Sequence, residues 1–197
     1  KNPTSMTNLN ITDIRKMENM VQTAERCTIV THMKPDGDAM GSSMAMYHFL
    51  KASGKEKVKI VIPDSYPDNL RFLISDNSEK DILTHACSPA EADAAVKESD
   101  LIICLDFNAF HRTDKLCGLL DASPAVKVLI DHHLYPELDK FSLAFSETEI
   151  SSACELLYQI LMAMPQIQHD AARLPKPAAM SLMTGMTTDT NNFANSV

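Results

Sequence analysis

The sequence predicts an α/β fold built on a mostly parallel sheet of about five strands flanked by helices. Two observations lead to this fold class. Short β-branched apolar runs alternate with longer segments of helical periodicity, and polar residues gather directly after several of the apolar runs. Such alternation is typical of parallel strands joined by helical crossovers. Of the 197 residues, 45% are hydrophobic and 22% charged, which is ordinary for a globular domain.

The first half of the chain predicts two helices and two strands. Residues 12–26 have apolar side chains at helical spacing, and residues 27–31 form a short, continuously apolar strand. After a Pro-Asp-Gly turn, apolar residues at i, i+4 and i+7 predict a helix over about 39–53, which Gly54 ends. Residues 57–62 are rich in valine and isoleucine and form the next strand.

The second half continues the alternation. A Ser-Pro start signal predicts a helix over 89–99. Further apolar runs predict strands over 100–105, 126–130 and 141–145. Ser152 and Glu155 match a capping box that opens an apolar helix. A last helix is expected over about 170–186, restarting after Pro175 and Pro177.

Composition and charge exclude several classes of protein. The formal net charge of -8 argues against a protein that coats long duplex nucleic acid, which needs a basic surface. No apolar run approaches the roughly 20 residues that cross a bilayer, and we expect neither a membrane partner nor a secretory signal. The five cysteines are widely spaced without a C-x-x-C pair. We therefore expect reduced cysteines in a cytoplasmic protein.

Four polar clusters follow predicted strands or end a predicted helix. The first holds His32, Asp36 and Asp38, the second Asp106, Asn108 and Arg112, the third Asp131, His132 and His133, and the fourth Asp189 and Thr190. Each cluster alone also fits an ordinary turn, helix cap or polar surface. The carboxyl ends of parallel strands share one edge of the sheet, however, so we expect the three strand-end clusters to converge.

Converging carboxylates would repel one another unless a cation offset their charge. Carboxylate and imidazole ligands without thiolates suit Mn²⁺, with Mg²⁺, Fe²⁺ or Co²⁺ as alternatives. The candidate ligands outnumber the needs of one ion, which favours a pair of ions able to activate water in phosphoryl transfer. The helix from Ala39 offers N–H groups to a phosphate. Arg112 fits a bidentate phosphate contact and an ordinary surface position about equally well.

These clusters resemble the four successive motifs of the DHH phosphoesterases, the superfamily that includes the RecJ exonucleases. The matching residues are His32-x-x-x-Asp36-Gly-Asp38-Ala-x-Gly41-Ser42, Asp106, Asp131-His132-His133 and Gly185-x-x-x-Asp189-Thr190. The resemblance implies that His32 and Asp36 bind one metal ion, that Asp38, His132 and Asp189 bind the other, and that Asp106 bridges the two. It also implies that His133 contacts the scissile phosphate or assists proton transfer, while Asp131 orients a histidine.

Within the superfamily, the chain is most similar to the branch of nano-RNases and 3′-phosphoadenosine 5′-phosphate phosphatases. Arg112 and the helix start at Ser152 carry this likeness. It implies a catalytic phosphate contact for Arg112 and substrate contacts for Asn108 and Ser152. Family members usually add a DHH-associated domain that binds substrate. We expect residues 1–197 to be the catalytic domain alone, with that second domain absent from this chain.

The expected function is hydrolysis of short oligonucleotides or linear dinucleotides, and of 3′-phosphoadenosine 5′-phosphate, with two divalent cations, Mn²⁺ foremost. Two alternatives stay open. One is an inorganic pyrophosphatase or exopolyphosphatase of the same superfamily, and the other is a non-catalytic nucleotide sensor. The expected partner is a short oligonucleotide or nucleotide substrate, and a homodimer is left open.

Overall fold

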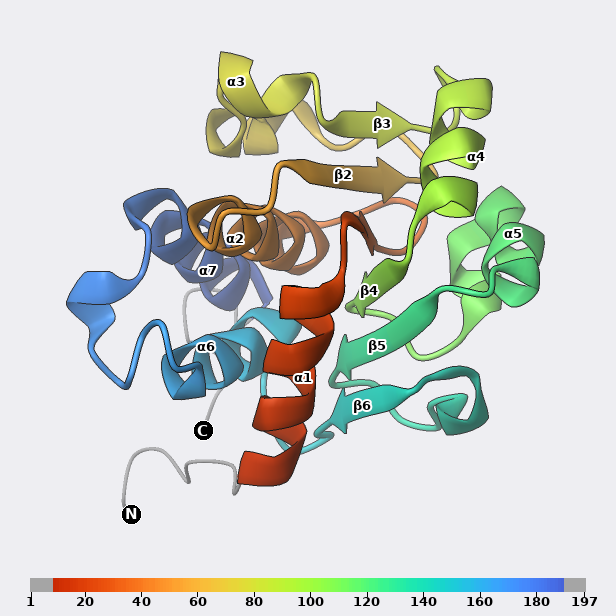
Figure 1. The fold of residues 1–197 in the computed structure, drawn as a ribbon. Helices are drawn as coiled ribbons and strands as arrows, with labels where there is room; N and C mark the ends of the chain where they lie inside the picture. Colours follow the sequence, from red (N-terminus) through yellow and green to blue (C-terminus); the bar gives the residue numbers. More distant parts are fainter. Residues whose placement is uncertain (1–8, 190–197) are drawn as a thin grey trace.

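A computed structural model describes residues 9–189 and shows a six-stranded parallel sheet between two layers of helices (Figure 1). The strands are β1 (Arg26–Val30), β2 (Lys57–Ile62), β3 (Ile82–Thr84), β4 (Leu101–Leu105), β5 (Val126–Asp131) and β6 (Leu143–Ser146). They lie in the order β3-β2-β1-β4-β5-β6, and every neighbouring pair is parallel. The predicted α/β class is confirmed. The strand not predicted is β3, whose three residues are too few to form a readable pattern.

The described α-helices are α1 (Ile11–Thr23), α2 (Gly37–Ala52), α3 (Asp76–Glu79), α4 (Pro89–Glu98), α5 (Cys117–Ala122), α6 (Ala153–Ala163) and α7 (Lys176–Asp189). Helix α1 ends three residues before the predicted boundary because the Asp100 carboxylate accepts the backbone N–H groups of Glu25 and Arg26, at 2.8 and 2.9 Å, and turns the chain into β1. Helix α7 starts at Lys176 instead of 170, since Pro175 interrupts any earlier helix.

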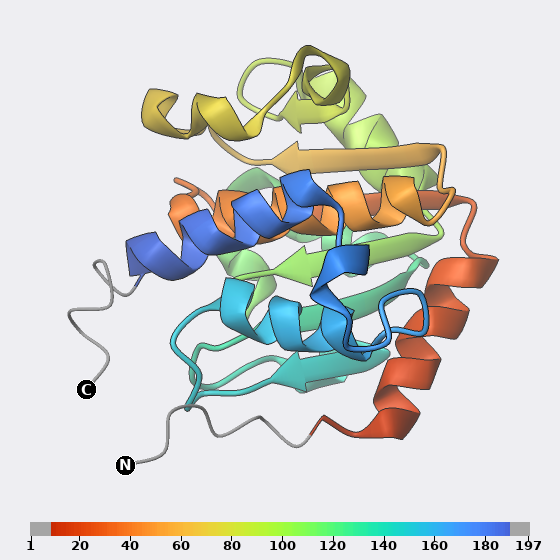
Figure 2. The ribbon, with the colours of Figure 1, turned by 90° about the vertical axis from the view of Figure 1, so that its left-hand side faces the viewer.

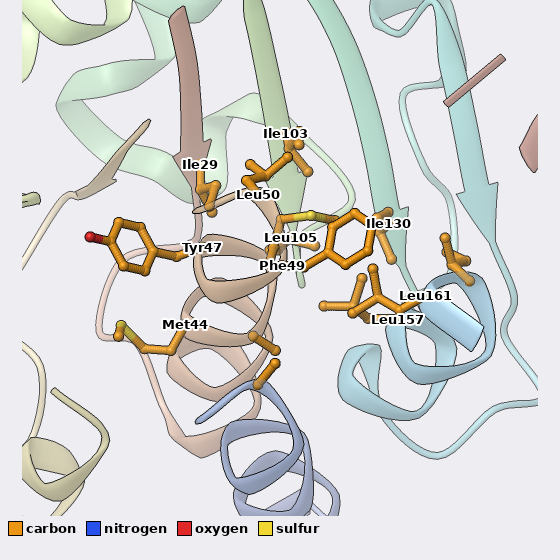
Figure 3. Packing of buried hydrophobic residues seen from close by; sticks show 14 of the residues in the cluster. Ile29, Met44, Tyr47, Phe49, Leu50, Ile103, Leu105, Ile130, Leu157 and Leu161 are labelled. Atoms are coloured by element: carbon orange, nitrogen blue, oxygen red, sulfur yellow. The ribbon is translucent and has the colours of Figure 1, made fainter. Parts of the chain in front are cut away.

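Side chains of the sheet alternate between two hydrophobic layers. Ile29 and Ile103 face the layer of α1, α2 and α6, whereas Val30 and Ile102 face the layer of α4 and α5. Figure 3 shows the first layer, where strand residues meet Phe49 and Leu50 of α2 and leucines of α6. Because both faces of the sheet are covered, its strands are mostly apolar and β4 is apolar throughout, which explains the apolar runs of the sequence.

The order of the strands reverses between β1 and β4. From β1 the chain moves outward to β2 and β3, then crosses back to β4 on the other side of β1 and continues to β5 and β6. In open parallel sheets such a reversal opens a crevice at the carboxyl ends of the strands, where ligands bind. We call this edge of the sheet the carboxyl edge; in Figure 2 the strand arrowheads point towards it.

Helices α2 and α7 pack unusually closely at the carboxyl edge. A Cβ atom added to Gly41 of α2 would lie 2.5 Å from the backbone oxygen of Ser181 of α7, so only glycine permits this approach. A Cβ atom at Gly37 would lie 2.2 Å from Thr188 Oγ1. The close contact holds the end of α7, with Asp189, beside the start of α2, and Figure 2 shows the two helix ends together.

Two expectations from composition can be compared with the described residues. Among the helices of residues 9–189, none combines the length and apolar character that crossing a bilayer would demand. The five cysteines are free, and Cys27, Cys104 and Cys154 are buried as small apolar side chains. The expected absence of a disulfide framework therefore agrees with this part of the chain.

Candidate metal centre

Strand ends and one helix start bring the predicted ligands together at the carboxyl edge. His32 follows β1, Asp106 follows β4 and His132 follows β5, while Asp36 and Asp38 lie at the start of α2. Three groups have potential ligand atoms within 4.8 Å of one another: His32, Asp36 and Asp106; Asp38, His132 and Asp189; and Asp106, His132 and His133. The first two groups are the ligand sets that the motifs predicted, and Asp106 lies in the first and third.

Asp106 occupies the centre of this arrangement. Its backbone has a left-handed conformation with a φ of 64°, and its side chain is 3% exposed. Oδ2 lies 3.4 Å from His32 Nε2, and Oδ1 lies 3.4 Å from His132 Nε2. Within the described residues, Oδ1 is buried and has no hydrogen-bond partner. A buried carboxylate oxygen without a donor is costly, and a cation between the two histidines would satisfy it.

Asp38 is held by the N-terminus of α6. Its Oδ2 accepts the backbone N–H of Ala153 at 2.6 Å, and its Oδ1 accepts that of Cys154 at 2.8 Å. A helix N-terminus favours such an anion. Burial, together with the nearby charge of Asp106, nevertheless raises the pKa of Asp38 to about 7. Asp38 is thus crowded enough to retain a proton near neutral pH unless a cation offsets its charge.

The start of α2 differs from the prediction. Asp36 Oδ1 accepts the backbone N–H groups of Asp38 and Ala39 at 3.1 and 3.0 Å and caps the helix. The helix therefore begins at Gly37 instead of Ala39. Because Asp36 already uses these N–H groups, the expectation that they bind phosphate is wrong. Their role is to fix the exposed Asp36 carboxylate beside His32.

His132 lies among three carboxylates. Its Nε2 atom is 3.4 Å from Asp106, 3.7 Å from Asp38 and 3.8 Å from Asp189. Burial alone would lower the pKa of His132, but the carboxylate of Asp106 only 3.4 Å away, with those of Asp38 and Asp189, raises it to about 9. The same carboxylates attract a proton on His132 and a metal ion bound to it. Metal binding here would therefore release that proton.

His133 is arranged differently from its neighbour. Its Nδ1 atom lies 2.7 Å from Asp131 Oδ1, and its backbone N–H donates to Asp131 Oδ2 at 3.1 Å. Asp131 is fully buried, whereas the side chain of His133 is 42% exposed. The hydrogen bond to Asp131 raises the pKa of His133. Asp131 therefore orients His133, whose ring reaches the surface beside the ligand groups.

Comparison with known proteins identifies the family. The family model described as "DHH family, N-terminal domain" matches residues 26–186, most of the chain. This chain belongs to the DHH family. The match contains the first three motifs completely and ends before Asp189 of the fourth. Thr190, the last residue of the fourth motif, lies outside the described residues.

Three relatives illustrate what this DHH chain is similar to. The cyclic-di-AMP phosphodiesterase PdeA of Listeria monocytogenes is 23% identical over 90% of this chain and 26% of PdeA. The bifunctional oligoribonuclease and PAP phosphatase NrnA of Mycoplasma genitalium is 28% identical over 89% of this chain and 49% of NrnA. The crystal structure of an exopolyphosphatase-related protein from Bacteroides fragilis has a TM-score of 0.87 and 36% identity, covering 97% of this chain and 54% of that one. The DHH chain thus spans about half the length of NrnA and of the exopolyphosphatase-related protein, and about a quarter of the length of PdeA.

The residues predicted to contact substrate have unequal access to the metal centre of this DHH chain. Asn108 donates from Nδ2 to the Leu134 carbonyl at 2.6 Å, which ties two loops of the carboxyl edge together. Ser152 is fully buried, and its hydroxyl caps α6 by accepting the Glu155 N–H at 3.0 Å. These hydrogen bonds favour structural roles for Asn108 and Ser152 over the expected contacts with substrate. Arg112 has an exposed side chain, and its carbonyl accepts the N–H of Met33, beside His32, at 2.8 Å.

The start of α6 and its contact with α7 depart from what the sequence predicted. The predicted capping box is only half present, because Glu155 reaches the N–H of Ser151 at 3.1 Å instead of that of Ser152. A Cβ atom at Gly185 would lie 2.2 Å from Cys154 Sγ and 3.1 Å from Asp38 Oδ1. Gly185 therefore leaves room for α6 to hold Asp38. Gly185 stands in the fourth motif, but no local pattern pairs Asp38 with residues 115 positions away.

A cavity of about 440 Å³ lies at the opposite edge of the sheet, lined by the amino ends of β1 and β2 and by α4. Three of its cationic side chains are paired with carboxylates, since Arg26 contacts Glu98, Lys57 contacts Glu25 and Lys59 contacts Asp81. The chemistry predicted from the motifs is at the carboxyl edge, so we do not assign the substrate to this cavity.

Proposed function

We propose that this chain is the catalytic domain of a two-metal phosphoesterase that hydrolyses short oligonucleotides or linear dinucleotides, and also 3′-phosphoadenosine 5′-phosphate. One observation carries the proposal: two ligand groups, each of carboxylates and imidazole, meet at the reversal of strand order around Asp106 Oδ1, which has no hydrogen-bond partner within residues 9–189. His32, Asp36 and Asp106 would hold one ion, and Asp38, His132 and Asp189 the other, with Asp106 between them.

The ligand chemistry supports Mn²⁺ as the ion. The donors are carboxylate oxygens and imidazole nitrogens. Such donors suit Mn²⁺ better than they suit metals that prefer thiolate ligands. When bound, a pair of such ions supplies an activated water and offsets charge on the transferred phosphoryl group. The carboxylates of the ligand groups make this offset favourable, because the substrate is itself an anion.

The side chains of the carboxyl edge would complete the site. Because Nδ1–H of His133 donates to Asp131, its Nε2 atom faces the substrate, and in the imidazolium form that the raised pKa favours it would donate a hydrogen bond to a phosphate oxygen or a proton to the leaving oxygen. The exposed guanidinium of Arg112 would bind a second phosphate oxygen. His133 and Arg112 thus act on the substrate, while Asp131 acts only through His133.

The choice of a nucleotide substrate is supported by two relatives, an oligoribonuclease and a cyclic-dinucleotide phosphodiesterase. A second candidate function is exopolyphosphatase or pyrophosphatase activity, which the exopolyphosphatase-related protein at 36% identity favours. A non-catalytic sensor is disfavoured because every predicted ligand within residues 9–189 lies in one of the ligand groups. The expected second domain, cytoplasmic location and homodimer stay predictions.

The test compares two substrates with the complete protein in the presence of Mn²⁺. A 5′-phosphorylated dinucleotide and pyrophosphate are supplied side by side, and product release is measured for the wild type and for Asp106→Asn. Dinucleotide turnover that the variant loses supports the proposal. Turnover of pyrophosphate alone would move the protein to the second candidate, and turnover of neither would favour the sensor.

A further inference from the structure

The segment that follows His133 exposes three large apolar side chains. Leu134 is 59% exposed, Tyr135 88% and Leu138 53%. We call residues 134–138 the apolar loop. Exposed apolar groups that gather beside polar residues often mark a surface that another molecule covers.

The apolar loop is fixed in place although its side chains are exposed. Asn108 Nδ2 donates to the Leu134 carbonyl at 2.6 Å, and the Glu137 N–H donates to the Asn108 carbonyl at 2.8 Å. The Phe110 N–H donates to Glu137 Oε2 at 3.1 Å. Tyr135 itself has a φ of 60°, a left-handed conformation that is unfavourable for a bulky side chain. The surroundings therefore hold an aromatic ring outward at a conformational cost.

The charges beside the apolar loop indicate what would cover it. The loop starts directly after His133 and is bonded to Asn108, two residues beyond Asp106. It is also bonded to Phe110, which begins the short 3-10 helix that carries Arg112. An apolar surface that directly follows a half-exposed histidine, and is hydrogen-bonded to the element that carries an exposed arginine, complements a ligand with a flat apolar part and an attached phosphate. A nucleotide has this combination, whereas pyrophosphate and polyphosphate lack the apolar part.

We infer that the apolar loop, with Tyr135 at its centre, contacts the nucleobase of the substrate and selects nucleotides over inorganic phosphoanhydrides. The inference rests on the proposed phosphoesterase function and names the part of the substrate that this surface recognises. Stacking of a base on an aromatic side chain accepts any base, because every base has a π face. The loop thus gives preference for a nucleotide without preference for one sequence.

The first experiment compares a 5′-phosphorylated diadenylate with the same backbone lacking its bases. The measured quantity is the ratio of kcat/KM for the base-containing over the abasic substrate in the presence of Mn²⁺. We expect Tyr135→Ala to lower this ratio about tenfold, the size typical of one stacked base. Tyr135→Phe keeps an aromatic ring and should keep the ratio. Val126→Ala, at the exposed amino end of β5, serves as the matched control for losing an exposed apolar side chain.

A second readout does not depend on turnover. The affinities of adenosine 5′-monophosphate and ribose 5-phosphate are compared by calorimetry, and Tyr135→Ala should weaken only the former. Tyr135→Gly removes the ring and also the unfavourable conformation, so we expect it to raise the melting temperature while lowering the kcat/KM ratio. A purely structural role for Tyr135 would not produce this split.

The outcomes separate the inference from the function on which it rests. A wild-type ratio near one, or a ratio unchanged by Tyr135→Ala, overturns the base contact while hydrolysis of both dinucleotides keeps the phosphoesterase proposal. A wild type that hydrolyses neither dinucleotide overturns both. Loss of a dimer or of a domain contact in Tyr135→Ala, with the ratio unchanged, would assign the apolar loop to a protein partner and contradict the base contact.

Discussion

Asp106 combines three unfavourable features in one residue: a left-handed backbone, a buried carboxylate and an oxygen without a hydrogen-bond partner among the described residues. Burial would raise the pKa of Asp106, but His132 and His32 outweigh it and keep the pKa lowered. The residue thus stays ionised in a place where an isolated charge would be costly. Such concentrations of strain and burial are retained where they serve a function.

Replacing Asp106 with asparagine tests this residue directly. Asparagine keeps the shape of the side chain and tolerates the left-handed backbone, but it removes the charge. We expect Mn²⁺ affinity to fall by more than about 100-fold, above the loss typical of an outer-shell partner, and hydrolysis to disappear. Calorimetric titration of the wild type and variant measures the change. Affinity within a few-fold of the wild type would show that Asp106 is no ligand.

Replacing His133 with alanine separates catalysis from metal binding. His133 is bonded to the buried Asp131 and half exposed, so it is placed to reach substrate. Turnover of a dinucleotide should fall about 10²- to 10⁴-fold, the range of a lost acid or base group. Mn²⁺ affinity should stay within a few-fold. Equal losses of metal affinity in His133→Ala and Asp106→Asn would contradict this division of roles.

At the level of single residues, the motifs predicted which side chains meet but not how they are held. His32, Asp38 and His132 were identified from their motif positions, and the structure places each of them in one of the ligand groups. The hydrogen bonds from the backbone N–H groups of Ala153 and Cys154 to Asp38 were not foreseen, because they join residues 115 and 116 positions apart. Short motifs record residue types, while hydrogen-bond partners at long range leave no local pattern.

Three helices together set the position of the metal centre. Helix α2 carries Asp36 and Asp38, α6 binds the Asp38 carboxylate, and α7 brings Asp189 beside them. Small residues where α2 and α7 meet make this arrangement possible, since a larger side chain would push the helices apart. The arrangement of elements, and no single loop, therefore determines the distance between the ligand groups.

Gly185→Ala tests this dependence on helix packing. The added methyl would overlap Cys154 Sγ at 2.2 Å and approach Asp38 Oδ1 at 3.1 Å. We expect the free energy of unfolding to fall by about 1–3 kcal/mol and Mn²⁺ affinity to weaken. Gly118→Ala in α5 is the matched control, because a Cβ atom there meets nothing within 4 Å and alanine favours helix. Melting temperatures are measured for both variants, and an equal decrease in Gly185→Ala and Gly118→Ala would exclude the packing explanation.

The unpredicted edge strand β3 follows a buried polar contact. Asp81, just before β3, accepts hydrogen bonds from the Tyr47 hydroxyl of α2 and the Lys59 ammonium of β2, both at 2.7 Å. Its carbonyl also accepts the Ile60 N–H at 2.8 Å. Burial would raise the pKa of Asp81, but Lys59 and Tyr47 together hold it below its usual value. Asp81 thus joins α2, β2 and β3 in its ionised form.

The pH dependence of stability should reveal this contact. A carboxyl whose folded-state pKa is lowered contributes stability above its unfolded pKa of about 3.9 and loses it as the pH falls through the folded value. We expect Asp81→Asn to lower the free energy of unfolding by about 1–2 kcal/mol near pH 7, a modest effect because Lys59 is partly exposed. Denaturant unfolding at several pH values measures the difference between wild type and variant. It should shrink below about pH 4, and a difference that grows there would contradict the assignment.

The whole fold could be predicted in outline because its signals repeat along the chain. Alternating apolar runs and helical segments predicted the parallel sheet, and the strand-end polar clusters predicted that the site lies at the carboxyl edge. The three residues of β3 and the four of α3 carry too short a pattern to detect. The order of the strands could not be predicted either, because it depends on which helix covers which face of the sheet.

At the scale of the molecule, this acidic chain gathers carboxylates at the point where its strand order reverses. Two cations bound there would explain why the carboxylates lie together. Counting the ions is the most direct test. The complete protein is titrated with Mn²⁺ by calorimetry, and crystals grown with Mn²⁺ are examined by anomalous scattering. We predict two ions per chain, one beside His32 and one beside His132, separated by about 3.5–4 Å. A single ion, or none at these residues, would contradict the account.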